Sequence, residues 1–306
     1  MYFPYLRGKQ FELEALLDVS PKVYLNTLPI IEPVNTTQRK FYRKLAGKGY
    51  PLILVTNPYH PQANRLTTAV VQGILDDELS TNPTVRVGYL IDQRFRLAHF
   101  TSFLNSNPSR GKAVIFRVNP LPADLTAIAA AITKHPVEYM IFDERLTNSA
   151  TRAVFNSHAQ KVLITDGFQH HDRNADYPPV STFSSNYNSW RIDGWYGIGD
   201  YLSIGDVFKE GGGQVYVVSL HITIESPSGL LMHHFSSRVH STIKGFSAEK
   251  FAEANSLLVA SPQVRPLSSS GIELFRDWHH RSHNPQLGAA KKASVMNHIE
   301  LLSSLI

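Results

Sequence analysis

Carboxylate side chains stand directly after several apolar runs of strand length in this sequence. The residues in these positions are Glu32, Asp92, Asp143, Glu144, Asp166 and Asp200. Carboxylates that gather at one place repel one another unless a cation, a proton or an arginine compensates their charge. If these residues converge in the fold, the cluster would suit a divalent metal ion or a paired general acid and base.

The polar residues at the ends of these runs suggest three kinds of role. Candidate catalytic residues are Asp143, Glu144 and Asp166, and candidate ligands for Mg2+, Mn2+ or Zn2+ are Glu32 and Asp92. Candidate substrate-binding residues, in or after other apolar runs, are Asn57, Arg117, Asn119, Asp200 and His221. Arg117 and Arg145 would hold an anionic group of the substrate. A structural alternative stays open, because an aspartate at the end of a strand is also a common helix cap.

Histidines offer a second source of metal ligands or proton carriers. Residues 170–172 (His-His-Asp) lie in a long polar segment and could serve in either role. An exposed loop is the preferred interpretation, because no second group of ligands at a fixed spacing accompanies them. His221 lies in a predicted strand, and His233 and His234 lie in the strand predicted to pair with it. Because side chains alternate along a strand, one of these three histidines points towards the core or the site. A packing role and a functional role both stay open for it.

The candidate residues lie on a repeating pattern of strands and helices. Six apolar runs alternate with helical patterns, and they cover residues 27–33, 51–58, 85–92, 113–119, 137–144 and 161–166. A short seventh strand is predicted at 195–200 and an eighth at 215–224. Strands that alternate with helices form parallel sheets covered on both faces. In such folds, ligands collect at the C-terminal ends of the strands, where these polar residues stand.

We therefore predict an α/β fold, namely a (β/α)8 TIM-like barrel in regular or distorted form, with a β-hairpin extension. An open doubly wound sheet is the alternative. The 306 residues are predicted to form one domain, with a long loop insertion at 167–194 and the hairpin at 215–236. The mixed aromatic and basic N-terminus, residues 2–9, is expected to plug the bottom of the barrel, in preference to stacking on nucleotides.

Composition excludes several classes of protein. The chain has no cysteine, which rules out disulfides, thiolate nucleophiles and thiolate zinc sites. Its net charge of +5 permits an anionic partner without requiring one. No signal peptide and no apolar run of membrane-spanning length is recognisable, so a cytoplasmic protein without membrane contact is expected.

The N-terminal motif Tyr5-Leu6-Arg7-Gly8-Lys9-Gln10-Phe11-Glu12, continued to Leu16 and followed by residues 28–33, carries a resemblance to a known family. It is similar to the opening of a group of bacterial proteins of similar length, which in turn resembles the phage "beta protein" family. The resemblance implies a component of a phage-related or antiviral defence locus with a nuclease-like protein as partner. It supplies no catalytic residues.

Two hypotheses follow. The first is a metal-assisted hydrolase that acts on a phosphorylated or nucleotide-like substrate. The second is a non-catalytic barrel that binds and regulates the nuclease-like partner, with a nucleotide or nucleic acid as a further candidate ligand. A cation held by the strand-end carboxylates would favour the first hypothesis. Carboxylates paired with lysines and arginines, together with an apolar patch on the hairpin, would favour the second.

Overall fold

The computed structural model describes residues 1–59, 66–158, 160–207 and 213–306, which form two compact units. The barrel unit contains Met1–Leu13, Tyr24–Thr165 and Ser189–Asp200, and the sheet unit contains Glu14–Val23, Asp166–Asn188 and Tyr201–Ile306. The chain passes from the first unit to the second within helix α1 (Gln10–Asp18), which the 3-10 helix η1 (Pro21–Leu25) follows.

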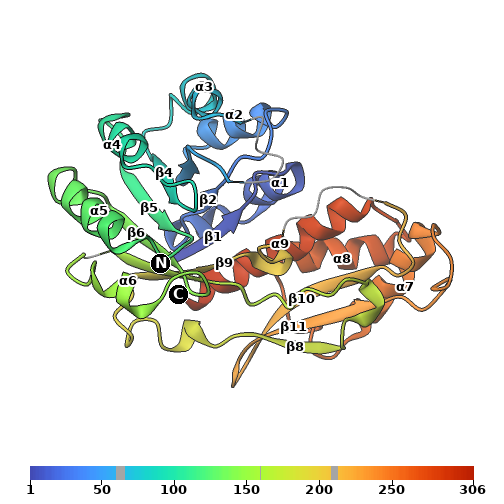
Figure 1. Ribbon diagram of the computed structural model, residues 1–306. Coiled ribbons are helices and arrows are strands. Elements are labelled where there is room, and N and C mark those ends of the chain that lie inside the picture. Colours follow the sequence, from blue (N-terminus) through green and yellow to red (C-terminus); the bar gives the residue numbers. More distant parts are fainter. Residues whose placement is uncertain (60–65, 159, 208–212) are drawn as a thin grey trace. The chain divides into compact units, whose positions relative to one another are not determined.

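In the described part of the barrel unit, eight parallel strands close into a barrel in the order β1-β2-β3-β4-β5-β6-β7-β9 (Figure 1). The strands are β1 (Tyr2–Leu6), β2 (Ile30–Ile31), β3 (Leu52–Val55), β4 (Val85–Ile91), β5 (Lys112–Phe116), β6 (Tyr139–Asp143), β7 (Lys161–Thr165) and β9 (Gly197–Asp200). The predicted (β/α)8 TIM-like barrel is confirmed, in place of the open doubly wound sheet.

Helices that follow the strands cover the outside of the barrel. They are α2 (Arg39–Gly47), α3 (Thr68–Glu78), α4 (Leu97–Asn105), α5 (Pro122–Lys134) and α6 (Ser149–Ala153). In α2, Phe41, Tyr42 and Leu45 are buried, whereas Lys40 and Lys44 are exposed. This spacing gives the helix one apolar face. The strands are covered on both sides, which explains why β3 and β5 are buried along their whole length.

The closure of the barrel differs from the sequence prediction. The assignment of residues 215–224 to the eighth barrel strand is wrong, because β9 pairs with both β7 and β1. A Cβ atom at Gly199 would overlap the carbonyl oxygen of Phe3, so glycine is what allows β9 to approach β1. The prediction that the N-terminus plugs the barrel is wrong as well, since Tyr2–Leu6 is its first strand.

In the sheet unit, the described strands form an antiparallel sheet in the order β10-β11-β8. β10 (Ser219–Ser226) and β11 (Gly229–Ser236) form a hairpin in the region predicted for one, and β8 (Val180–Ser184) pairs with β11. The helices of this unit are α7 (Ser247–Ala260), α8 (Ser270–His280), α9 (Leu287–Leu305) and the 3-10 helices η3 (Asn174–Asp176), η4 (Asn186–Asn188) and η5 (Leu202–Ile204).

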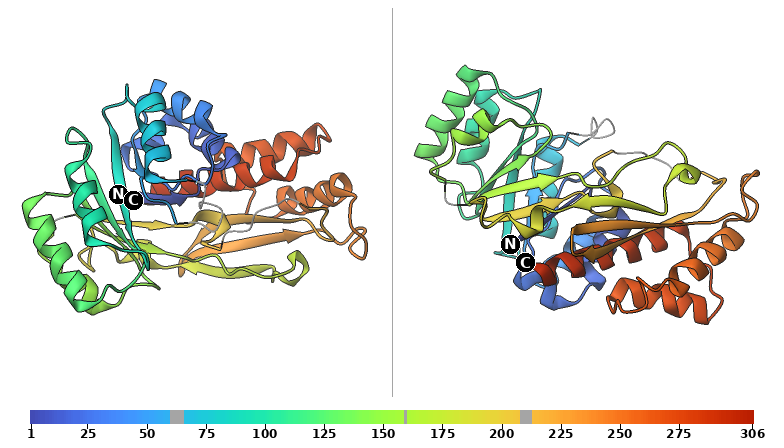
Figure 2. Two further views of the ribbon diagram at one scale, coloured as in Figure 1. Left: turned by 45° about the horizontal axis from the view of Figure 1, so that its top comes forward. Right: turned by 90° about the horizontal axis from the view of Figure 1, so that it is seen from below.

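Helices α7, α8 and α9 cover one face of this sheet (Figure 2). Leu220, Ile222 and Ile224 of β10 pack in one core with Phe251 of α7 and Phe275 of α8. Because side chains alternate along a strand, His221 and Thr223 point away from this core, and the Thr223 hydroxyl lies 2.6 Å from Nδ1 of His298 in α9. No helix in the described residues is both long and apolar enough to cross a membrane.

Candidate functional site

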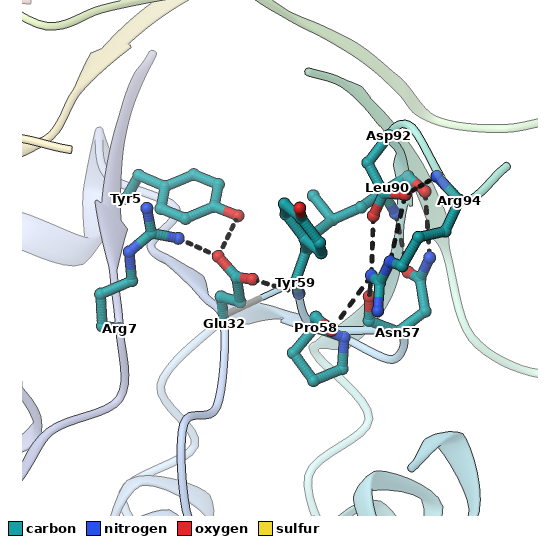
Figure 3. Close-up of polar contacts among 9 residues, drawn as sticks. All are labelled: Tyr5, Arg7, Glu32, Asn57, Pro58, Tyr59, Leu90, Asp92 and Arg94. Atoms are coloured by element: carbon teal, nitrogen blue, oxygen red, sulfur yellow. Dashed lines mark hydrogen bonds and ion pairs between the residues drawn. The ribbon is translucent and has the colours of Figure 1, made fainter. Parts of the chain in front are cut away.

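Glu32 is the centre of a buried polar network at the C-terminal end of the barrel strands (Figure 3). Its Oε2 atom accepts a hydrogen bond of 2.8 Å from the Tyr5 hydroxyl and forms an ion pair with Arg7. Its Oε1 atom accepts a hydrogen bond of 2.6 Å from the backbone N–H of Tyr59. A fully buried carboxylate is tolerated when a cation and hydrogen-bond donors replace its water, and Glu32 has both.

The N-terminal motif builds this network. Tyr5 and Arg7 contact Glu32, and Gly8 turns the chain with a φ of +64°. A Cβ atom at Gly8 would lie 2.6 Å from the Tyr42 hydroxyl, so both the dihedral angle and the space favour glycine. Glu12 then accepts a hydrogen bond of 2.7 Å from the backbone N–H of Arg7 and stabilises the start of α1. The motif therefore has an architectural role at each of these positions.

Asp92 follows β4 and is paired with a cation close to it in sequence. The guanidinium of Arg94 lies 2.7 Å from Asp92 Oδ2, and the Arg94 backbone N–H donates to Asp92 Oδ1 at 2.7 Å. The same guanidinium stacks 4.4 Å above the ring of Tyr59. Asn57 links β3 to β4, because its side chain donates to Leu90 O at 3.0 Å and accepts from Leu90 N at 2.8 Å.

Asp143 lies at the end of β6 between two arginines. Its Oδ2 atom is 3.9 Å from Arg117 Nε, and its Oδ1 atom is 4.0 Å from Arg145 Nε. Backbone N–H groups of Arg145 and Leu146 donate to Oδ1 at 3.0 and 3.3 Å. The neighbouring Glu144 accepts a hydrogen bond of 2.7 Å from the Thr165 hydroxyl. Arg117 and Arg145 thus lie beside the same carboxylate, and their predicted role towards an anionic group of a substrate stays a prediction.

Two other candidates of the barrel unit have structural partners. Asp200 accepts a hydrogen bond of 2.8 Å from the Tyr2 hydroxyl, and both residues are buried. Asn119 accepts from Asn148 N at 2.8 Å and from the Thr151 hydroxyl at 3.0 Å, and so supports the first turn of α6. Asn119 therefore supports the N-cap residue of α6, which is Asn148.

The remaining two candidates, Asp166 and His221, belong to the sheet unit. Asp166 accepts hydrogen bonds from the backbone N–H groups of Phe168 at 3.3 Å and Asp206 at 3.2 Å, which ties two loops together. The Nδ1 atom of His221 lies 2.7 Å from Nδ1 of His234. The structure therefore gathers Glu32, Asp92, Asp143, Glu144 and Asp200 at the strand ends of one barrel, and it assigns these two residues to another unit.

The donor set at the barrel mouth does not fit a metal ion well. In the described parts of the chain, no group of three or more His, Asp or Glu side chains is placed to hold one. Glu32 and Asp92, the predicted ligands, each have an arginine as ion-pair partner. The predicted metal site and the predicted catalytic roles stay predictions.

A cleft that was not predicted from the sequence lies between α3 and α4, beside the ends of β3 and β4. This α3–α4 cleft has a volume of about 830 Å³. Its lining combines aromatic rings with polar groups, namely Tyr89, Phe95, Phe103, Asn57, Gln72 and Asn107. The rings of Tyr89 and Phe103 are 5.1 Å apart at their centroids. Asp92 and Arg94 lie at the same cleft and join it to the barrel mouth.

The tyrosine hydroxyls around these sites stay protonated. Burial, and then the neighbouring Glu32, raise the pKa of Tyr5 well above its ordinary value, and burial with Asp200 does the same for Tyr2. Burial and Asp92 raise the pKa of Tyr89 to about 12. These three hydroxyls are therefore hydrogen-bond donors, which suits carboxylate partners and polar ligand groups.

Comparison of the chain with protein-family models, with curated proteins and with solved structures found no match. The resemblance of the N-terminal motif stays a prediction.

Proposed function

We propose that the barrel unit binds a nucleotide-like small molecule in the α3–α4 cleft and that it binds this ligand without hydrolysing it. The observation that carries the proposal is the cleft itself. Its volume of about 830 Å³ lies within the usual range for small-molecule sites. It is open to a ligand at the C-terminal ends of parallel strands, where such folds bind ligands.

The lining of the cleft suits a planar base joined to a phosphorylated sugar. Aromatic rings such as Tyr89, Phe95 and Phe103 stack on bases. The amide oxygens of Asn57 and Gln72 each accept one hydrogen bond within the protein and have a second lone pair for a base edge. The first turn of α3 opens into the same cleft, with Thr67 as its N-cap. Unpaired backbone N–H groups and the helix dipole favour a phosphate at such a position.

The barrel mouth supports binding over hydrolysis. Carboxylates that neutralise arginines are poor ligands for a second cation, and a carboxylate with several donors is a poor general base. Glu32, Asp92 and Asp143 each have an arginine within ion-pair distance. This pairing is the feature expected of a regulatory barrel. The nuclease-like partner implied by the N-terminal resemblance would be the protein regulated.

Titration of the full chain with adenosine and guanosine mono- and triphosphates tests the binding proposal. We expect saturable binding by calorimetry. Ser102→Trp places a large ring in the cleft and should weaken binding at least tenfold. Thr101→Trp is the matched control, because Thr101 is the adjacent exposed residue of α4 and does not line the cleft. Absence of saturation, or equal binding by both variants, contradicts the proposal.

Phosphate release from the same nucleotides separates binding from hydrolysis. We expect no release above background with Mg2+, Mn2+ or Zn2+. Metal-dependent release that Asp143→Ala abolishes would instead establish the metal-assisted hydrolase, and thermal stabilisation by one of these ions in the native chain but not in Asp143→Ala would identify the metal.

A further inference from the structure

Three side chains of the sheet unit form a buried hydrogen-bonded chain across its three strands. The Ser181 hydroxyl of β8 lies 2.9 Å from His234 Nε2 of β11. His234 Nδ1 lies 2.7 Å from His221 Nδ1 of β10. The strand register produces this arrangement, because His221 is directly opposite His234 and Ser181 is opposite Met232, two positions away. Side chains two positions apart share one face of a sheet.

The two ring nitrogens of His234 have different partners, so the tautomer of His234 decides which partner donates a proton. A neutral imidazole carries one N–H donor and one acceptor nitrogen. When Ser181 donates its proton to Nε2, His234 must carry its own proton on Nδ1 and donate it to His221. A hydroxyl hydrogen-bonded to a histidine that a third group orients is the arrangement of an activated nucleophile, whatever the fold.

The surroundings keep both histidines uncharged. The ring of Tyr177 stacks on His234 with centroids 4.8 Å apart, and Phe168 meets His221 edge-on at 5.1 Å. Burial, helped by the nearby His171 and His233, lowers the pKa of His234 to about 4. Burial, helped by His234, lowers the pKa of His221 to about 3. At neutral pH, His234 is therefore uncharged, and in the tautomer with its proton on Nδ1 its Nε2 atom accepts from the Ser181 hydroxyl.

We propose that Ser181 is the nucleophile of an acyl-transfer site that hydrolyses carboxylic esters, with His234 as its general base and His221 as a positioning residue. Ser181 keeps 8% of its surface exposed. The site lies wholly within the sheet unit and does not depend on ligand binding in the α3–α4 cleft.

The steps are those of a serine esterase. Ser181 Oγ bonds to the carbonyl carbon of the ester while its proton passes to His234 Nε2. The carbon–oxygen bond to the alcohol then breaks, and the alcohol leaves with the proton from His234. Water attacks the acyl-serine and gives a proton to His234. The bond between the acyl carbon and Ser181 Oγ then breaks, and His234 returns a proton to Ser181 Oγ. The carboxylic acid is released.

The chemistry of the base selects the substrate class. A histidine held neutral by burial is a weak base, so it assists the attack of the serine less than an ordinary imidazole does. An activated ester with a good leaving group, such as a phenol, needs the least assistance. Apolar rings of Phe168 and Tyr177 flank the imidazoles, which favours an apolar acyl group over a charged one. Short-chain aryl esters are therefore the appropriate probes.

Labelling of the native full chain with a fluorophosphonate, followed by peptide mass spectrometry, tests the proposal. We expect the label on Ser181, and heat-denatured protein should not acquire it. Ser236→Ala is the matched control. Ser236 is a half-buried serine of β11 in the same sheet, and its described hydroxyl partner is Ser219 and not a histidine. Labelling should survive in Ser236→Ala and disappear in Ser181→Ala. An unlabelled native chain overturns the proposal, and this outcome does not depend on the folding of a variant. A label that stays in Ser181→Ala overturns the proposal as well.

Substitutions of the histidines separate the base from the positioning residue. His234→Gln should lower the rate of labelling, and of p-nitrophenyl acetate hydrolysis, by about 100-fold or more, as expected when a general base is lost. His221→Asn keeps an acceptor for His234 Nδ1 and should retain more activity than His221→Phe. Unchanged rates in His234→Gln overturn its role as base, and equal rates in the two His221 variants overturn the positioning role.

Discussion

Three carboxylates at the barrel mouth are paired with arginines, whereas two histidines of the sheet unit are uncharged at neutral pH. Glu32 accepts from Tyr5 and a backbone N–H and is paired with Arg7. His221 and His234 instead hydrogen-bond to each other through their Nδ1 atoms. Both networks place polar groups away from water and supply them with partners, as burial requires.

The ion pairs of the barrel mouth and the histidine pair of the sheet unit are sensitive to different changes. A buried ion pair is most sensitive to the loss of one partner, because the other charge then has neither water nor a counterion. A buried neutral pair is most sensitive to acid, because protonation creates a charge where none was present. The barrel mouth should therefore respond chiefly to mutation and the histidine pair chiefly to pH.

Arg7→Met should have the largest effect. Methionine keeps an unbranched apolar side chain but leaves the Glu32 carboxylate without its cation, and such a loss costs about 3–5 kcal/mol. Denaturant unfolding of the full chain would measure it. The double variant Arg7→Met with Glu32→Gln removes both charges and should recover a large part of the loss. A loss below about 1 kcal/mol in Arg7→Met would mean that the pair contributes no more than an exposed one.

Acidification should have the next largest effect. The folded-state pKa values of His221 and His234, about 3 and about 4, lie below the ordinary value of 6.5. Below pH 6.5 the unfolded chain therefore binds protons that the folded chain does not, and the free energy of unfolding falls as pH falls. The slope is at most about 1.4 kcal/mol per pH unit for one histidine, or about 2 kcal/mol between pH 6.5 and 5.

Thermal or denaturant unfolding of the native chain across this pH range measures the slope. His234→Asn removes one titrating group and should flatten it. Other charged groups act on the pair, namely His170, His171, His233 and Lys291. An identical slope in the native chain and in His234→Asn would show that the carboxylates elsewhere, and not this pair, set the acid response.

The sequence was sufficient to predict the strands that are buried on both faces. Strands β3 to β7 are mostly apolar, and burial of both faces is what such runs indicate. It was insufficient for β1, which contains Pro4 and was not predicted as a strand. The region of β9 was predicted as a short seventh strand at 195–200, and the more hydrophobic run at 215–224 was counted as the eighth strand in place of β1.

The strand pattern also made part of the candidate site predictable. Strand-end carboxylates follow directly from the strand pattern, and Asp92 stands two residues from its partner Arg94. Arg7 and Glu32 are 25 residues apart, and no local pattern identifies their pairing. The α3–α4 cleft depends on how two helices pack over β3 and β4, and no local sequence pattern predicts this packing. Asp166 and His221 lie in the sheet unit because contacts far apart in sequence define that unit.

Asn57→Ala tests whether an uncharged group at the barrel mouth behaves like the ion pair. The Asn57 amide satisfies both the N–H and the C=O of Leu90, and its loss should cost about 1–2 kcal/mol. The change in the denaturation midpoint measures this cost. Asn119→Ala is the control, because Asn119 is exposed and supports a helix cap, so its loss should cost about 1 kcal/mol or less. Equal costs would mean that the burial of Asn57 adds nothing.

Arg145→Gln should lower the free energy of unfolding the least. It therefore tests whether burial causes the difference between this ion pair and the pair of Arg7 with Glu32. Arg145 lies 4.0 Å from Asp143, but 45% of its side chain is exposed, compared with 11% for Arg7. Water and salt screen an exposed pair, so the loss should be below about 1 kcal/mol. Raising the salt concentration should shrink it further, whereas the effect of Arg7→Met should stay nearly constant because buried pairs are screened much less. If Arg145→Gln proves as costly as Arg7→Met, exposure does not distinguish the two pairs, and Asp143 must be held as tightly by its arginines as Glu32 is.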